Sequence, residues 1–376
     1  MRAFVFAVAL TPTTLVAQTR PAPPPAGYPA FAGPIYTPIP DSPTQDPNSS
    51  AIIANMMAQL SSSQLAPFRA AAPPYTGSGY NIDYNYPIYY SVPTDPEYTL
   101  WCYFQGTWGD CPLNGTTIHI PNAAYPEQSG GAYAAGPGNS DHHMTVIDSE
   151  TGTQYDMYQA SPPNGSGGDF TIGWGSSESL TGQGITTFQA TRSGFAASAA
   201  VVRAPDLQAG SISHALRFVV PCANDYPGNV SDGTGVYPAA VSSDRYCTGT
   251  GYQPYYGMRI QLTMSASQIA ALPVSAYVKT ILTALATYGA YMTDTGSGNQ
   301  GSGEFDLVAE SGLTYVQVGL ANPWLCLATQ FGVSASGTPP NNTYSFPMML
   351  AGVGIGNIGS YLRVIAPCVT THACTY

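Results

Sequence analysis

The sequence predicts a mainly β protein: an antiparallel β-sandwich, jelly-roll-like, with one or two packed α-helices. From about residue 80 to 265, short apolar or β-branched runs alternate with clusters of Gly, Asn, Asp, Pro and Ser, as in strands joined by tight turns. By contrast, one segment near 275–288 has strong helical periodicity. A β domain of about 300 residues is within the size range of a single domain.

The N-terminus predicts export from the cell. A short basic start precedes an apolar run and the small residue Ala17, so residues 1–17 are predicted to be a signal peptide and the mature protein to be secreted. Residues 18–50 are rich in Pro and Ala and predict an extended leader. Residues 51–376 are then the single β-sandwich domain. No later run approaches the roughly 18 to 20 apolar residues of a membrane helix.

Each element of the domain follows from a local pattern. The spacing of Ile52, Met56 and Leu60 predicts an N-terminal helix, and a second helix begins at Ser275 and ends before Gly289. Strands are predicted over 116–120, 144–147, 155–158, 170–174, 214–220, 258–264, 290–294, 315–320, 324–329 and 361–366. The turn at 148–153 joins two of these strands as a hairpin, in which Gly152 can supply a positive φ.

The chain carries few charges and is acidic overall. Charged residues make up 8% of it, against about 25% in an ordinary soluble domain. The formal net charge of −11, with Lys279 as the single lysine, argues against nucleic acid or an anionic membrane as a partner. Few positive charges accumulate in acid, so we expect a protein that stays folded there, although charge density also varies among secreted proteins without such adaptation.

Seven cysteines in an exported chain predict disulfides. Their spacing favours Cys102 with Cys111 and Cys222 with Cys247. The other three cysteines leave two alternatives, namely Cys368 with Cys374 or Cys326 with Cys368. No CxxC pair occurs, which argues against a zinc ribbon.

The best indication of chemistry is the run 140–148, which holds two of the five histidines. Strand alternation places Asp141 and His143 on one face, where the carboxylate can orient the imidazole as a general base. Across the hairpin, Tyr155 and Asp156 can add a phenol and a second carboxylate. The alternative is a turn-capping aspartate beside a half-exposed strand histidine.

His214 is the third candidate histidine. Alternation places it with Ile212, Leu216, Phe218 and Val220, which favours a core histidine hydrogen-bonded to backbone or to a buried carboxylate. The functional interpretation is a second imidazole that meets His143 in one groove. No cofactor is expected, and a divalent metal, if bound, would be held by Asp141, His143 and His214. Asp294, before a Gly-rich loop, is a weaker acid or base candidate.

Aromatic residues are abundant, with 27 tyrosines and four tryptophans. A group of them surrounds the first predicted disulfide: Trp101, Tyr103, Phe104 and Trp108. Tyr and Trp rings stack on sugar rings and tolerate water at their polar tips, but they also fill the cores of β-sandwiches.

Four motifs together resemble a group of secreted, β-rich, functionally uncharacterised proteins of soil bacteria. The motifs are Asp141-x-His143, Tyr155-Asp156-x-Tyr158, the run Ile212 to Phe218, and Leu285-x-x-Tyr288-Gly289-x-Tyr291-x-x-Asp294-x-Gly296. The resemblance covers roughly residues 130 to 300 and implies an exported bacterial protein, with no activity to carry over. The domain is also similar, at the level of fold alone, to jelly-roll polysaccharide lyases and glycosidases.

These observations predict a secreted enzyme that cleaves a polysaccharide, as a lyase or a glycoside hydrolase. Asp141, His143 and His214 would meet in a groove, and Tyr155 or Asp156 would complete the acid and base set. Two alternatives from other classes are a non-catalytic polysaccharide-binding or cell-surface protein and an acid-stable peptidase. The expected partner is a polysaccharide or oligosaccharide, and we expect a monomer.

Overall fold

The computed structural model describes residues 31–61, 65–71, 85–127, 141–185, 191–226, 236, 247–296, 303, 305–316, 318–336, 343–348, 350 and 353–367. The predicted signal peptide and the first part of the leader lie outside these ranges. The described residues form fifteen strands in four sheets and six α-helices. None of these helices combines the length and apolar character needed to cross a bilayer.

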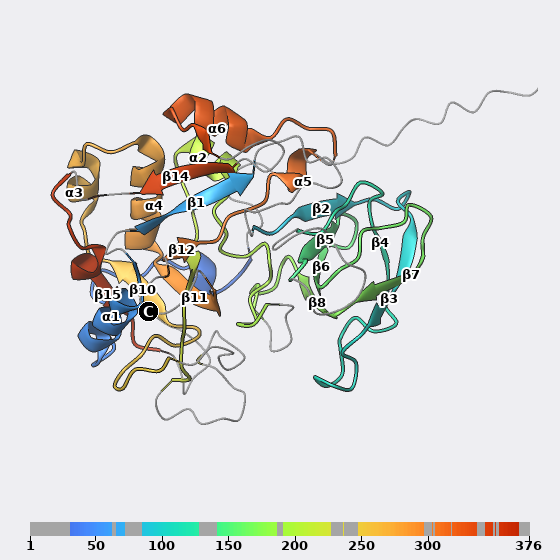
Figure 1. The fold of residues 1–376 in the computed structure, drawn as a ribbon, viewed down its shortest axis with the longest axis horizontal. Coiled ribbons are helices and arrows are strands. Elements are labelled where there is room, and N and C mark those ends of the chain that lie inside the picture. The colour runs from blue at the N-terminus through green and yellow to red at the C-terminus, as the bar shows by residue number, and fades with distance from the viewer. Residues whose placement is uncertain are drawn as a thin grey trace, which may run out of the picture.

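Strands β2 to β8 lie together on one side of the molecule (Figure 1). A four-stranded sheet has the order β2 (Ile88–Ser91), β5 (Met144–Asp148), β6 (Thr153–Tyr158) and β8 (Trp174–Ser179). A three-stranded sheet has the order β4 (Thr117–His119), β3 (Glu97–Cys102) and β7 (Gly168–Ile172). One buried cluster joins the two sheets, with Leu100 and Phe170 from the second and Val146 and Met157 from the first. Burial of these apolar side chains is the main force holding the sheets together.

The other side carries a five-stranded sheet and most of the helices (Figure 1). Its strand order is β12 (Asp306–Leu307), β9 (Leu216–Val220), β11 (Ala290–Thr295), β10 (Arg259–Leu262) and β15 (Leu362–Val364). The largest apolar core joins this sheet to helices α1 (Ser49–Ala58), α2 (Ala204–Ala209), α3 (Ala266–Ala271), α4 (Ala276–Thr287) and α6 (Pro323–Phe331). A separate antiparallel sheet has the order β1 (Leu65–Ala71), β14 (Thr343–Met348) and β13 (Ala335–Ser336).

The hairpin predicted around residues 148–153 is confirmed. Strands β5 and β6 pair antiparallel, with Asp148 opposite Thr153. Gly152 has a φ of 63° and its N–H donates to the Asp148 carbonyl at 2.9 Å, which is the left-handed position that favours glycine in such a turn. This hairpin fixes the direction of the chain that carries His143.

The predicted helix near 275–288 is confirmed as α4. It begins after Ser275, the N-cap residue, and the chain leaves it through Gly289, whose φ is 73°. A Cβ at residue 289 would collide with the carbonyl oxygen of Ile260 in β10. Only glycine therefore allows the close approach by which the chain passes from α4 directly into β11.

Two features of the predicted fold are wrong. The sheets are not purely antiparallel, because β2 pairs parallel with β5, β3 with β7 and β9 with β11. The strands predicted at 315–320 and 324–329 are replaced by helices α5 (Leu313–Val316) and α6. Helix α6 has its own capping signals: the Asn322 side chain accepts from the Trp324 N–H at 3.0 Å, Pro323 occupies its first turn, and Gly332 ends it in the left-handed conformation.

Both predicted disulfides are confirmed, Cys102 with Cys111 and Cys222 with Cys247. Such bonds are typical of proteins that fold in oxidising compartments. Cys326 is an exposed free thiol within the described part of the chain. The alternatives that involve Cys368 and Cys374 lie outside the described residues.

Candidate functional site

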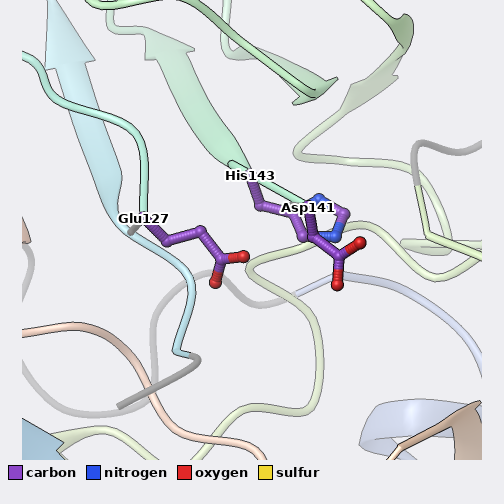
Figure 2. A group of neighbouring side chains, drawn as sticks. All are labelled: Glu127, Asp141 and His143. Carbon is purple, nitrogen blue, oxygen red and sulfur yellow. The ribbon is translucent and has the colours of Figure 1, made fainter. Parts of the chain in front are cut away.

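Three side chains meet at the N-terminal end of β5: Glu127, Asp141 and His143 (Figure 2). One ligand atom from each lies within 4.8 Å of the others. Glu127 is 2% exposed and His143 is 8% exposed, whereas Asp141 is exposed. The group is therefore mostly buried, with one carboxylate that solvent reaches.

Backbone hydrogen bonds hold these residues together. The Glu127 N–H donates to the His143 carbonyl at 2.9 Å, and the His142 ring donates from Nδ1 to the Glu127 carbonyl at 2.8 Å. The Gln159 N–H donates to the Asp141 carbonyl at 2.7 Å, which continues the pairing of β5 with β6 beyond the strand ends. His142 has a φ of 42°, an uncommon value for a residue other than glycine.

Two tyrosine rings border the imidazole of His143. Tyr86 makes an edge-on contact with a centroid distance of 4.7 Å, and Tyr158 lies at 5.5 Å. The guanidinium of Arg217, on β9, lies 4.9 Å from the centroid of Tyr86 and donates to its hydroxyl at 3.5 Å. It also donates to Thr293 Oγ1 at 3.2 Å. Tyr86 thus links His143 to the five-stranded sheet, and the site lies where the two sides of the molecule meet.

Burial sets the protonation of the ring. The pKa of His143 is lowered to about 4, because burial disfavours the imidazolium. Asp141 opposes this effect, whereas Arg217 and His142 add to it. The imidazole is therefore neutral above about pH 4 and can accept a proton there. Burial also raises the pKa of Tyr86 above its ordinary value, against the opposing charge of Arg217.

Asp156 and Tyr155 make other contacts. The Asp156 carboxylate is buried and accepts hydrogen bonds from Thr145 Oγ1 at 2.7 Å, from the Gln154 amide at 2.8 Å and from the Ala197 N–H at 2.9 Å. Burial raises its pKa in spite of these donors. Tyr155 is half-buried on the other face of β6 and faces the charge of Asp148. The Asp156 carboxylate therefore belongs to a buried hydrogen-bond network with Thr145, Gln154 and Ala197.

His214 also has partners of its own. Its Nδ1 donates to the Ala215 carbonyl at 2.7 Å, its Nε2 lies 3.7 Å from an Asp206 carboxylate oxygen, and its ring lies 5.5 Å from that of Tyr36. It precedes β9 and is buried. These contacts match the core histidine beside a buried carboxylate that strand alternation favoured. The rings of His143 and His214 thus contact different residues.

Sequence reasoning missed Glu127 and Tyr86. Neither residue stands in a recognisable motif, and both reach His143 through pairings that are distant in sequence. The three side chains that could hold a divalent ion are Glu127, Asp141 and His143, so Glu127 takes the place that we expected for His214. One nitrogen and two oxygen donors would suit a first-row divalent metal.

The segment that carries the site is negatively charged throughout. No lysine or arginine occurs from residue 70 to 191, whereas eleven Asp and Glu do. The formal charge of these eleven carboxylates equals the formal net charge of the whole chain, −11. The charges of this segment therefore favour cations over polyanions, while Arg217 of β9 brings one buried positive charge to the site.

Comparison of the chain with protein-family models, with curated proteins and with solved structures finds no match. The site brings two carboxylates together with a neutral imidazole, and no lysine or arginine occurs in the surrounding sequence from 70 to 191.

Proposed function

We propose that the protein is a secreted carbohydrate-active enzyme that hydrolyses a neutral polysaccharide at Glu127, Asp141 and His143. The observation that carries this proposal is the meeting of a buried carboxyl, an exposed carboxylate and an imidazole within 4.8 Å. Glycoside hydrolysis in most families requires such a pair of carboxyl groups, one as the acid and one as the nucleophile or base.

Burial differs between the two carboxyl groups and suggests their roles. Glu127 is 2% exposed, and we assign it the role of the acid that protonates the leaving glycosidic oxygen. Asp141 is exposed and suits the carboxylate that attacks the anomeric carbon. In the second step, water displaces Asp141 and gives its proton back to Glu127, so the net reaction adds one water across the cleaved bond.

The spacing of the carboxylates predicts the stereochemistry. An oxygen of each lies within 4.8 Å of the other. Retaining enzymes place the two groups roughly 5 to 5.5 Å apart, whereas inverting enzymes need roughly 6.5 to 9.5 Å to admit a water. We therefore expect the product to keep the anomeric configuration of the substrate.

His143 has the protonation behaviour of a proton-transfer group for an acidic medium. A group of this kind works best when its pKa is near the operating pH, and the pKa of His143 is about 4. Asp141 favours its protonated form. This behaviour supports the acid adaptation that the low charge density led us to expect.

Charge favours hydrolysis of a neutral chain over the lyase alternative. A lyase must neutralise the uronate carboxylate of its substrate, and the sequence from 70 to 191 offers no lysine or arginine for this. The guanidinium of Arg217 is fully buried beside Tyr86. The jelly-roll-like sandwich remains part of the proposal, because such folds carry many glycan-cleaving enzymes.

Incubation with a panel of neutral and uronic polysaccharides tests the proposal. We expect new reducing ends from a neutral polysaccharide and no rise in absorbance near 235 nm, where the unsaturated product of a lyase absorbs. Glu127→Gln and His143→Ala should each lower the rate about 10²- to 10⁴-fold. Glu127→Gln keeps the size of the side chain and should change the melting temperature by a few degrees at most, whereas His143→Ala also removes the ring contacts with Tyr86 and Tyr158 and should lower it. A rise at 235 nm on a uronic polysaccharide would instead identify a lyase.

A non-catalytic polysaccharide-binding protein is the second candidate. It is favoured by the exposure of Trp101, Tyr103 and Trp108 at one end of the three-stranded sheet, because exposed aromatic rings stack on sugars. Retention on an insoluble neutral polysaccharide that the protein leaves intact would select this candidate.

A further inference from the structure

A second cluster of side chains lies outside the carboxylate site. Among the described residues, five large apolar or aromatic side chains are exposed, and three of these belong to β3 and the loop that follows it. They are Trp101, Tyr103 and Trp108, which are 45%, 59% and 55% exposed. We refer to these three residues as the aromatic surface.

The loop that carries this surface is ordered by its own bonds. The disulfide between Cys102 and Cys111 closes it. Within it, the Gly106 N–H donates to the Gly109 carbonyl at 2.8 Å, and the Gln105 side chain accepts from the Cys111 N–H at 2.7 Å. Rings on a loop held in this way lose little conformational freedom when a ligand binds, which favours recognition.

Aromatic contacts lead from this surface to the carboxylate site. Trp108 stacks on Phe104 with a centroid distance of 3.8 Å, and Tyr103 packs edge-on against Phe104 at 5.0 Å. Trp108 also lies 6.0 Å from Tyr158, whose ring is 5.5 Å from that of His143. The chain of rings thus runs without a break from exposed Trp108 to buried His143.

Polar groups beside the rings are acceptors or amides. Asp169 accepts from the Trp101 indole N–H at 2.8 Å, and Asp110 accepts from the Gln105 amide at 3.1 Å. No lysine or arginine occurs from residue 70 to 191. Carboxylates and amides next to aromatic faces match the hydroxyls and the apolar faces of neutral sugars, whereas a polyanion would be repelled.

We propose that Trp101, Tyr103 and Trp108 bind a neutral polysaccharide chain, and that Trp108 and Tyr158 lead this chain toward His143. The binding half of this proposal stands on the exposed rings and their charge environment. The second half rests on the proposed hydrolytic function, because it assigns His143 to the centre where the chain is cut. The ligand class is therefore a chain of uncharged sugar residues that carries neither uronate nor sulfate.

Binding to insoluble polysaccharides tests the proposal without reliance on cleavage. Purified full-length protein is mixed with chitin, cellulose, insoluble xylan and, as an anionic comparison, calcium alginate gel, and the unbound protein is measured. We expect binding to at least one neutral material and none to alginate. Trp108→Ala and Tyr103→Ala should each weaken binding roughly fivefold to tenfold, the effect of losing one aromatic contact of about 1 kcal/mol.

Tyr252→Ala is the matched control, because Tyr252 is 42% exposed and is not part of the aromatic surface. It should bind as the wild type does. If Trp108→Ala and Tyr103→Ala bind neutral polysaccharide as strongly as Tyr252→Ala does, the proposal is overturned. Binding of the wild type to alginate alone would also overturn it. So would a concentration-dependent dimer that Trp108→Ala abolishes and neutral polysaccharide leaves unchanged, since the surface would then bind a second copy of the chain.

The two proposals fail in different ways. Polysaccharide binding that needs Trp108, with no cleavage of any material, would end the hydrolytic proposal and retain the binding half of this one. Cleavage that is lost in His143→Ala and unchanged in Trp108→Ala and Tyr103→Ala, at subsaturating substrate, would retain the hydrolytic proposal and overturn this one.

Discussion

The buried pair of Arg203 and Glu310 supplies a sharp test of the structure around the site. Arg203 Nε lies 3.3 Å from Glu310 Oε2, and both side chains are almost fully buried. Tyr315 donates to the same carboxylate at 2.8 Å. The Glu310 backbone forms a parallel bridge with Tyr86, so the pair fixes the segment that places Tyr86 against His143. We predict that Glu310→Gln and Arg203→Met each strongly destabilise the protein.

The magnitude follows from the charge that each change leaves behind. Breaking a buried ion pair costs about 3 to 5 kcal/mol, because one charge stays buried without compensation. After Glu310→Gln, Arg203 still feels the charge of Asp206, so this variant should lie near about 3 kcal/mol. After Arg203→Met, both Glu310 and Asp206 lose their cation, so this variant should lie near about 5 kcal/mol.

Urea unfolding of the two single variants and the double variant measures these values. The loss of unfolding free energy in the double variant should be smaller, by at least about 2 kcal/mol, than the sum of the losses in the two single variants. The reason is that neither charge of the pair remains buried alone. The dependence of the unfolding free energy on urea should stay that of the wild type if only stability changes. Losses below about 1 kcal/mol for both singles, or strict additivity in the double variant, would refute a buried ionic contact.

Three further predictions concern other parts of the fold. Gly289→Ala should lower the unfolding free energy by at least about 1 to 2 kcal/mol, because residue 289 has a positive φ and a Cβ would meet Ile260; an unchanged urea midpoint would contradict this. Burial raises the pKa of Asp156, so the folded state holds this proton more tightly than the unfolded state, and stability falls as pH rises from the ordinary aspartate value through the folded pKa. Melting temperatures between about pH 3 and 7 should show this fall in the wild type and a weaker one in Asp156→Asn; equal slopes would argue against a raised pKa. Replacing Cys102 and Cys111 by serine should weaken binding to neutral polysaccharide, because the open loop loses conformational entropy when it binds. Binding equal to that of the wild type would show that the disulfide does not order the aromatic surface.

The elements that sequence predicts well are those with local causes. The β5–β6 hairpin follows from alternation and from Gly152, and α4 follows from its periodic apolar residues and from Gly289. The two confirmed disulfides follow from short sequence separations. In each case, the information that decides the structure lies within about 25 residues of chain.

The parts that sequence missed depend on distant partners or on ambiguous runs. Parallel pairing of β2 with β5 joins segments more than fifty residues apart, and no local sequence pattern predicts this pairing. The run at 324–329 is short and apolar, so periodicity alone fits a strand or a helix. Its caps at Asn322 and Gly332 decide for a helix, and weighing them would have corrected the prediction.

The residues of the candidate site also differ in how far the sequence could predict them. Asp141 and His143 stand two residues apart and their side chains lie together, but both precede β5, which begins at Met144, and His142 between them has a positive φ. Glu127 is brought to them by contacts between distant segments, namely its backbone bond to His143 and the bond from the His142 ring to its carbonyl. His214 shares the apolar pattern of a core residue, and its contacts with Asp206 and Tyr36 are those of a buried histidine.

The rate of reducing-end release by Glu127→Gln tests the central claim most directly. It is measured on the neutral polysaccharide that the wild type cleaves, with Asp156→Asn as the control, because Asp156 is a buried carboxylate in the same part of the fold that hydrogen-bonds Thr145, Gln154 and Ala197. We predict a rate about 10²- to 10⁴-fold below that of the wild type for Glu127→Gln and a rate near that of the wild type for folded Asp156→Asn. A Glu127→Gln enzyme that cleaves as fast as the wild type, or a wild type that cleaves no polysaccharide, would contradict the account.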